Sequence, residues 1–128
     1  MAADTVLVRY IVDDVDAALA FYTSHLGFDT VMHPAPGFAM LARGALRLAL
    51  SAPGGPGGGG QAMPDGRVPE PGGWNRISLP VDDLDAEVER LRAGGARFRN
   101  AIVDGVGGRQ ILVEDPAGNP VELFEPKR

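Results

Sequence analysis

The sequence contains no cysteine, which excludes disulfide bonds, thiolate metal sites and cysteine nucleophiles. It also has no apolar run near the ~18 residues that a membrane-spanning helix requires. The N-terminal residues lack the basic start and the apolar stretch of a signal peptide. We therefore expect a cytoplasmic protein with no membrane partner.

Basic side chains are too few for a nucleic-acid partner. The formal net charge is -5, whereas binding to phosphates depends on an excess of Lys and Arg. Lys127 is the only lysine, so nearly all cations are arginines, which either form bidentate anion sites or reflect a biased genome composition. The 128 residues, 45% hydrophobic and 23% charged, fit one folded domain rather than a disordered tail.

An internal repeat organises the chain. The segment Val12–Ala17 reappears as Val81–Ala86, an offset of 69 residues (81 minus 12). Each copy follows an alternating β-type run and precedes a helical stripe of apolar residues. Asp14 and Asp83 stand where N-caps belong, and glycines shortly after each stripe predict the helix ends. Motif, strand and helix therefore repeat together.

Three further strand-like segments follow each helix, so each half is predicted to be one βαβββ module. Module one covers about residues 4–51 and module two about residues 74–126. The Gly- and Pro-rich residues 52–73 between them are a flexible linker or a mobile flap over a site. Because a module of ~60 residues buries little surface alone, we expect both modules to pack in one domain and the chain to form a homodimer. The predicted strands are Val6–Val12, Phe28–His33, Phe38–Arg43, Ala45–Ser51, Ile77–Val81, Arg97–Val103, Arg109–Glu114 and Pro120–Glu125.

This pattern resembles the vicinal oxygen chelate superfamily. The resemblance rests on the repeated Val-x-Asp motif, on Phe21–Phe28 (FYTSHLGF) and on Asp115–Leu123 (DPAGNPVEL), and it extends over nearly the whole chain outside the linker. It implies an α+β fold in which a curved mixed sheet surrounds a cleft. It does not fix the reaction, because the superfamily contains glyoxalase I, extradiol dioxygenases, fosfomycin-resistance enzymes and bleomycin-resistance proteins.

Strand alternation predicts which side chains face the cleft. Trp74, the only tryptophan, is either a core residue or a stacking platform for a flat ligand. Arg97 and Arg99 flank Phe98 on what we expect to be a solvated outer face. The candidate ligand-binding residues are Arg9, Phe38, Arg47, Trp74, Arg76, Glu122 and Phe124.

The resemblance also implies four positions for a metal site. Metal-using relatives place one ligand, usually His, Gln or Glu, on each of four strands, and the matching positions here are Leu7, Arg47, Arg76 and Glu122. Leucine has no lone pair to donate, and the guanidinium groups are permanently positive, so only Glu122 could bind a cation. Because a catalytic ion needs three or more protein ligands, we expect no metal cofactor.

Two other groups allow more than one interpretation. The side chains of His25 and His33 are interpreted as surface or loop residues, and the alternative is a displaced metal site. Arg47, Arg76 and Glu122 form either a salt-bridge network or an anchor for a ligand's carboxylate, phenolate or carbonyl group.

The leading hypothesis is a metal-free protein that binds a small molecule in its cleft. It would sequester an aromatic or hydrophobic natural product, as bleomycin-resistance proteins do. The alternatives are an enzyme of the same fold, either a lyase or dioxygenase with an atypical metal site or a metal-free isomerase, and a structural or regulatory dimer. The sequence identifies neither the ligand nor whether the cleft forms within one chain or across two.

Overall fold

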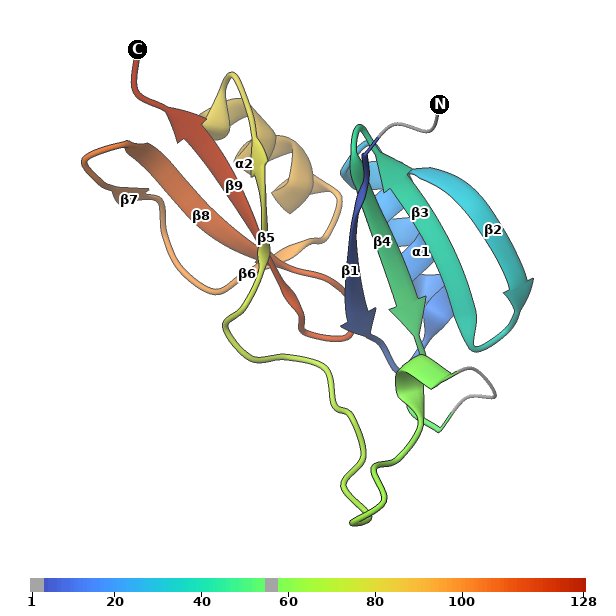
Figure 1. Cartoon of the computed structure of the whole chain (residues 1–128). Helices are drawn as coiled ribbons and strands as arrows, with labels where there is room; N and C mark the ends of the chain where they lie inside the picture. The colour runs from blue at the N-terminus through green and yellow to red at the C-terminus, as the bar shows by residue number, and fades with distance from the viewer. Residues whose placement is uncertain (1–3, 55–57) are drawn as a thin grey trace. The chain divides into compact units, whose positions relative to one another are not determined.

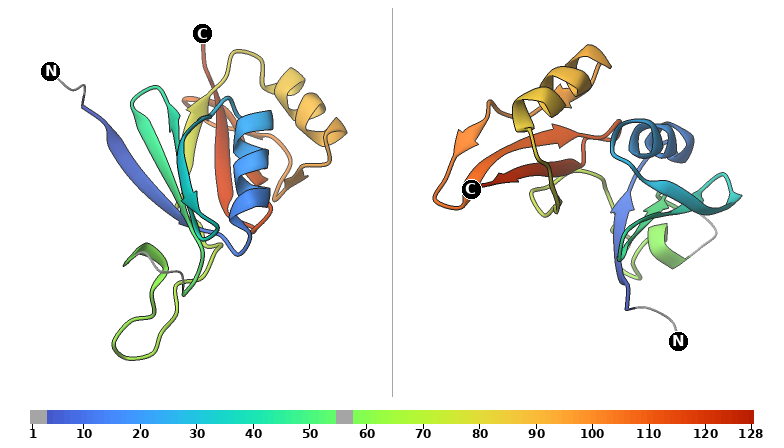
Figure 2. Two further views of the ribbon diagram at one scale, coloured as in Figure 1. Left: turned by 90° about the vertical axis from the view of Figure 1, so that its right-hand side faces the viewer. Right: turned by 90° about the horizontal axis from the view of Figure 1, so that it is seen from above.

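The computed structural model describes residues 4–54 and 58–128, and it divides the chain into two compact units, Met1–Gly72 and Gly73–Arg128. Each unit contains one copy of the repeat and is described by itself. In each unit a single helix covers one face of a sheet (Figures 1 and 2). The fold is α+β, as predicted.

Unit 1 carries a four-stranded sheet in the order β1-β4-β3-β2. Strands β1 and β4 are parallel, whereas β3 runs antiparallel to both of its neighbours. Tyr22 of the helix is fully buried, and its ring makes edge contacts with Tyr10, Phe21 and Phe28, so an aromatic cluster joins the helix to the sheet. The elements are β1 (Val6–Ile11), α1 (Val15–His25), β2 (Asp29–Ala35), β3 (Phe38–Arg43) and β4 (Leu46–Ser51).

Unit 2 repeats this topology, but two short strands replace the single edge strand that pairs with the central hairpin. The strand order is β5-β9-β8-β6, β5 and β9 are parallel, and β7 pairs separately with β8. The predicted strand Arg97–Val103 is wrong as one element, because two short strands lie at its ends. Helix α2 buries Leu84, Val88 and Leu91, the predicted stripe, against the sheet. The elements are β5 (Ile77–Pro80), α2 (Leu84–Ala93), β6 (Arg97–Phe98), β7 (Val103–Asp104), β8 (Gly108–Glu114) and β9 (Pro120–Pro126).

Both helices begin at the predicted aspartates. The Asp14 carboxylate accepts a hydrogen bond from the Ala17 amide at 3.0 Å, and the Asp83 carboxylate accepts one from the Ala86 amide at 3.1 Å. Each N-cap therefore satisfies one amide of the first helical turn, a contribution of about 1 kcal/mol to the free energy of unfolding. Asp14 and Asp83 are explained by this local role.

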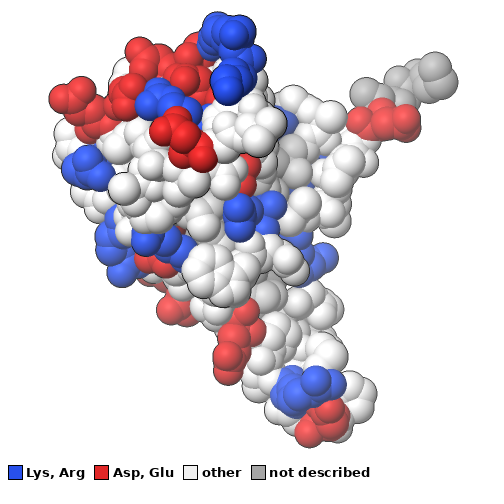
Figure 3. All heavy atoms as spheres, turned by 90° about the vertical axis from the view of Figure 1, so that its left-hand side faces the viewer, with Lys and Arg blue, Asp and Glu red and all other residues white. Residues whose placement is uncertain are grey.

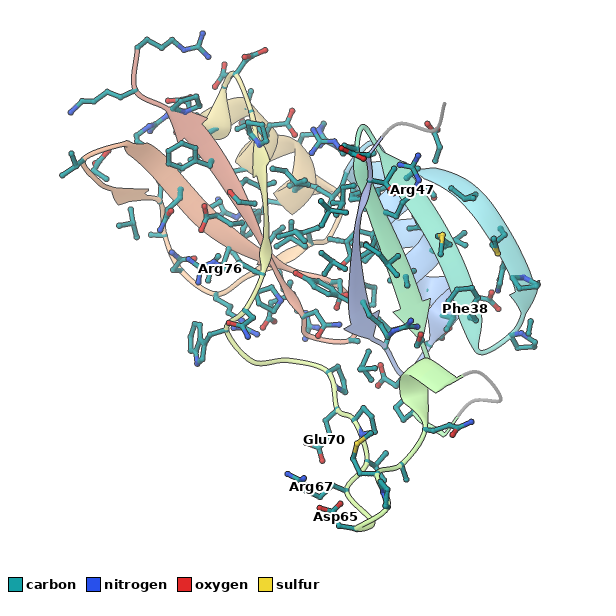
Figure 4. The ribbon with its side chains drawn as sticks, viewed as in Figure 1. Phe38, Arg47, Asp65, Arg67, Glu70 and Arg76 are labelled. Carbon is teal, nitrogen blue, oxygen red and sulfur yellow. The ribbon has the colours of Figure 1, made fainter. Side chains whose placement is uncertain are left out.

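The Gly-rich segment between the strands of the two units folds back in part onto unit 1. A 3-10 turn, η1 (Gly58–Gly60), follows β4, and the Gly54 amide donates to the Gly60 carbonyl at 2.6 Å. Farther along, Figure 4 labels Asp65 and Arg67 at the tip of a loop, where their side chains form an ion pair at 2.8 Å. Part of the glycine run that we interpret as a linker, residues 55–57, lies outside the described residues.

Candidate functional site

The predicted alternation of side chains holds on the first strand of each unit. In unit 1, Tyr10 is buried towards the helix, whereas Leu7 and Arg9 are exposed on the opposite face. In unit 2, Ile77 and Leu79 are buried, and Ser78 between them is exposed. In each unit, the side chains that are available to a ligand therefore lie on the sheet face that carries no helix.

A hydrogen-bonded cluster lies on this face of unit 2. Arg76 donates from Nε and Nη2 to Oε1 of Glu122, at 3.1 and 2.9 Å, and Ser78 donates from Oγ to Oε2 at 2.8 Å. Arg76 also donates to the Trp74 carbonyl at 3.3 Å. The Glu122 side chain is only 14% exposed. Both of its carboxylate oxygens are therefore engaged by unit 2 itself.

Trp74 is not a core residue, because it is 70% exposed. The Arg99 guanidinium carbon lies 4.7 Å from the centre of the indole, and together with Gly73 and Glu114 the two residues line a shallow depression. The structure therefore excludes the interpretation of Trp74 as a core residue. The indole ring is exposed, and the Arg99 guanidinium covers one of its faces.

The prediction that Arg99 lies on a solvated outer face is wrong. Its guanidinium donates to Glu114 Oε2 at 2.9 Å, to the Gly73 carbonyl at 2.6 Å and to the Gly118 carbonyl at 2.8 Å. The error came from extending strand alternation beyond Phe98, where β6 already ends. Arg99 therefore anchors the start of unit 2 instead of lying on a solvated face.

Phe124 lies on the same face of β9 as Glu122, two residues farther along the strand. In the sheet it is opposite Gln110 of β8 and Pro80 of β5. The Phe124 side chain is partly exposed, so it adds an apolar surface to the face that carries the Arg76–Glu122 cluster.

A pocket of about 470 Å³ lies in unit 1 and brings together two of the predicted ligand-binding residues, Arg9 and Phe38. Phe38 is opposite Ser51 in the sheet, so their side chains lie on the same face, and Arg9 donates from Nη1 to Ser51 Oγ at 2.8 Å. The glycines of η1 form another wall. Sequence reasoning missed Ser51, although its same-face position could have been read from the alternation of β4.

Arg47 does not share this pocket. Its Nη1 donates to the carbonyl of Gly44, in the turn before β4, at 2.8 Å, and to that of Leu46, the first residue of β4, at 3.1 Å. Figure 4 shows Arg47 and Phe38 at opposite ends of the unit 1 sheet. The hydrogen bonds of Arg47 thus lie within unit 1, whereas Arg76 and Glu122 bind each other in unit 2.

The strand register also corrects one of the four positions compared with metal-using relatives. Arg9 is opposite Ala49, and Ser78, the repeat counterpart of Arg9, is opposite Glu122. The unit 1 counterpart of Glu122 is therefore Ala49 and not Arg47. Alanine offers no donor atom either, so the side chains at the four corrected positions (Leu7, Ala49, Arg76 and Glu122) do not fit a divalent cation.

Other possible metal ligands are dispersed. Nε2 of His33 lies 3.4 Å from an Asp16 oxygen, and the His25 ring contacts Phe21. Among residues 4–54 and 58–128, no group of three or more His, Asp and Glu side chains is placed to hold an ion. On the face drawn in Figure 3, basic side chains lie close to acidic ones. Arg109, for example, forms ion pairs with Asp85 and Glu125 of its own unit. No helix of the described residues is long and apolar enough to cross a membrane.

The fold and these sites define a class of protein, the duplicated βαβββ proteins of the vicinal oxygen chelate type. The chain belongs to the Glyoxalase/Bleomycin resistance protein/Dioxygenase superfamily, whose family model matches residues 5–123. No curated protein matches the sequence.

Solved structures resemble the chain over almost its whole length. A member of the same superfamily from Sphaerobacter thermophilus is 30% identical, with a TM-score of 0.75 and 98% of each chain covered. TnmS3 of Streptomyces sp. CB03234, described as an antibiotic binding protein, is 26% identical, with a TM-score of 0.73 and the same coverage. A lactoylglutathione lyase from Agrobacterium tumefaciens, 24% identical with a TM-score of 0.72, covers 98% of this chain and 94% of its own, and supports the fold alone.

Proposed function

We propose that this chain is a metal-free binding protein that sequesters an aromatic or hydrophobic natural product in the cytoplasm. One observation carries the proposal. Glu122 is the only side chain among the four positions that could bind a cation, and both of its oxygens accept hydrogen bonds from Arg76 and Ser78. A metal would have to break these bonds and would then find one protein ligand where it needs three or more.

The remaining features fit binding of a flat, partly apolar molecule. Trp74 presents an exposed indole backed by Arg99, and Phe124 and Phe38 add partly exposed rings in units 2 and 1. The likeness to TnmS3, an antibiotic binding protein, supports the same ligand class. In this proposal the Arg76–Glu122 pair neutralises the position that holds a metal ligand in metal-using relatives.

The protein acts as a homodimer in this proposal. Each unit contributes a single layer of helix on a sheet, which buries little surface by itself, and duplicated folds of this size gain stability from a second chain.

A thermal-shift screen of aromatic antibiotics tests the binding function. A ligand at 100 times its dissociation constant stabilises the folded protein by about 2.7 kcal/mol and should raise the melting temperature by several degrees. Trp74→Ala should reduce this shift, while Trp74→Phe should retain most of it, because the stacking surface is then kept. A broad panel that produces no shift would contradict the proposal.

Elemental analysis separates the binding protein from an enzyme that uses a metal. We expect protein purified in the presence of zinc, nickel, manganese and iron salts to contain far less than one ion per chain. A stoichiometric ion that is lost in Glu122→Gln would overturn the argument from the donor atoms and would favour a lyase or an oxygenase.

A further inference from the structure

Arg9 differs from three other arginines in its surroundings. Arg76, Arg99 and Arg109 each form an ion pair with a carboxylate of their own unit. Arg9 forms no ion pair with any acidic residue that the structure describes in unit 1, and its hydrogen-bond partner there is the neutral Ser51 hydroxyl. Residues 1–3 and 55–57 contain no acidic side chain by sequence. The charge of Arg9 is therefore not balanced by a carboxylate of unit 1.

The position of the Arg9 guanidinium is restricted from two sides. Ser51 Oγ accepts from Nη1 on one side. On the other side the backbone of Gly59 lies so close that a Cβ added there would overlap the guanidinium group. A Cβ on Gly60 would overlap the Ala52 carbonyl, so η1 itself lies directly against the end of β4. Glycine is therefore required for this close approach, which holds the cation at the pocket wall.

The same pocket offers an aromatic surface. Phe38 lines it together with Arg9, and its ring is partly exposed. The pocket volume of about 470 Å³ lies in the range that suits a small organic ligand. A planar guanidinium favours a planar carboxylate, with which it forms two parallel hydrogen bonds.

We propose that the unit 1 pocket binds an aromatic carboxylate, whose charged oxygens accept hydrogen bonds from Arg9 while its ring packs against Phe38. Gly59 keeps the guanidinium in place for this contact. The inference rests on the proposed binding function and narrows it, since it assigns the ligand an anionic end and names the part of the protein that receives it.

The test compares an acid with its neutral analogue. Binding of 2-naphthoate and 2-naphthamide to the full-length protein is followed by NMR, through the backbone amides of Gly58, Gly59 and Gly60. We expect 2-naphthoate to bind about tenfold more tightly, the factor that corresponds to one charge-assisted hydrogen bond. Binding of 2-naphthoate should shift the amide signals of these three glycines. The Arg9→Gln variant should bind the acid and the amide equally.

Two glycine variants test whether binding depends on the position of the Arg9 charge as well as on its presence. Gly59→Ala displaces the guanidinium without removing it and should weaken 2-naphthoate binding about tenfold, with little effect on 2-naphthamide. Gly105→Ala in unit 2 is the control, because Gly105 lies outside this pocket and a Cβ there meets only the Gly108 carbonyl oxygen, at an ordinary contact distance of 3.6 Å; this variant should bind like the unchanged protein. Dispersed NMR spectra show that each variant is folded.

Several results would overturn the inference. They are equal affinities for acid and amide, a preference that survives Arg9→Gln, or no binding of 2-naphthoate at millimolar concentration. If antibiotics from the thermal-shift panel still stabilise the protein in that case, the binding function stands and only the anionic subsite fails. If they do not, the binding function fails as well.

Discussion

At the scale of single residues, the arginines differ by what already occupies their hydrogen-bond donors. Arg76 is committed to Glu122, and Arg99 is committed to one carboxylate and two backbone carbonyls. Arg47 binds the carbonyls of Gly44 and Leu46 at the start of β4. Arg9 alone among these four lies in a pocket with a neutral partner. The surroundings of an arginine, and not its place in the sequence, therefore decide whether it can receive a ligand.

Arg99→Ala tests the anchoring role at this scale. The substitution removes three hydrogen bonds and leaves the partly buried Glu114 without its cation, so the free energy of unfolding should fall by about 2 kcal/mol. Urea unfolding followed by the fluorescence of Trp74, the only tryptophan, measures the change. Arg97→Ala in β6 is the control, since Arg97 is exposed, and it should change the free energy of unfolding little. Equal losses in the two variants would contradict the assignment.

At the scale of elements, the residues that were predicted well are those whose local chemistry decides their structure. Asp14 and Asp83 each follow a strand and precede an apolar helical stripe, and each caps the helix that begins there. Alternation on β1 and β5 correctly separates buried from exposed positions. Arg99 could not be predicted, because β6 ends after Phe98 and the chain then turns towards Gly73, a contact between residues 26 positions apart. Alternation carries no information beyond the end of a strand.

Glu125 of β9 joins two elements and makes stability depend on pH. Its carboxylate accepts from the Leu84 amide at the start of α2 and from Arg109, and these hydrogen bonds lower the pKa of Glu125 below its ordinary value of 4.5. The same contacts with Asp85 and Glu125 raise the pKa of Arg109, which therefore stays charged. Because the carboxylate is favoured in the folded state, its contribution to stability is present above pH 4.5 and is lost as pH falls through the lower, folded-state pKa.

We therefore expect Glu125→Gln to lower the free energy of unfolding at neutral pH. In this variant the free energy of unfolding should also fall less steeply between neutral and acidic pH. Urea unfolding at a series of pH values measures both effects. The matched variant is Glu89→Gln on α2, whose carboxylate is exposed, and its profile should follow that of the unchanged protein. Parallel profiles for Glu125→Gln and the unchanged protein would show that the helix contact does not depend on the charge.

At the scale of the whole molecule, the repeat allowed the fold to be predicted, while the site was predicted only in part. Val12–Ala17 and Val81–Ala86 mark equivalent helix starts, so both βαβββ units follow from the sequence. The sequence grouped Arg76 and Glu122 with Arg47, but the separation of Arg47 from this pair and the approach of Gly59 to Arg9 were not predictable in detail. They depend on strand register and on a backbone contact, and neither is encoded by a pattern within one segment.

The proposed homodimer is tested by the mass of the protein in solution and by the dependence of its melting temperature on protein concentration. Strands β1 and β2 are the two edges of the unit 1 sheet, and each exposes two large apolar side chains, Val6 and Leu7 on β1 and Val31 and Met32 on β2. Exposed apolar edges are unfavourable in water and favour association with another chain. Sedimentation should give twice the chain mass of 13.4 kDa, and the melting temperature should rise with protein concentration, because dissociation accompanies unfolding. A species of 13.4 kDa whose melting temperature does not change with concentration would show instead that one chain is stable alone.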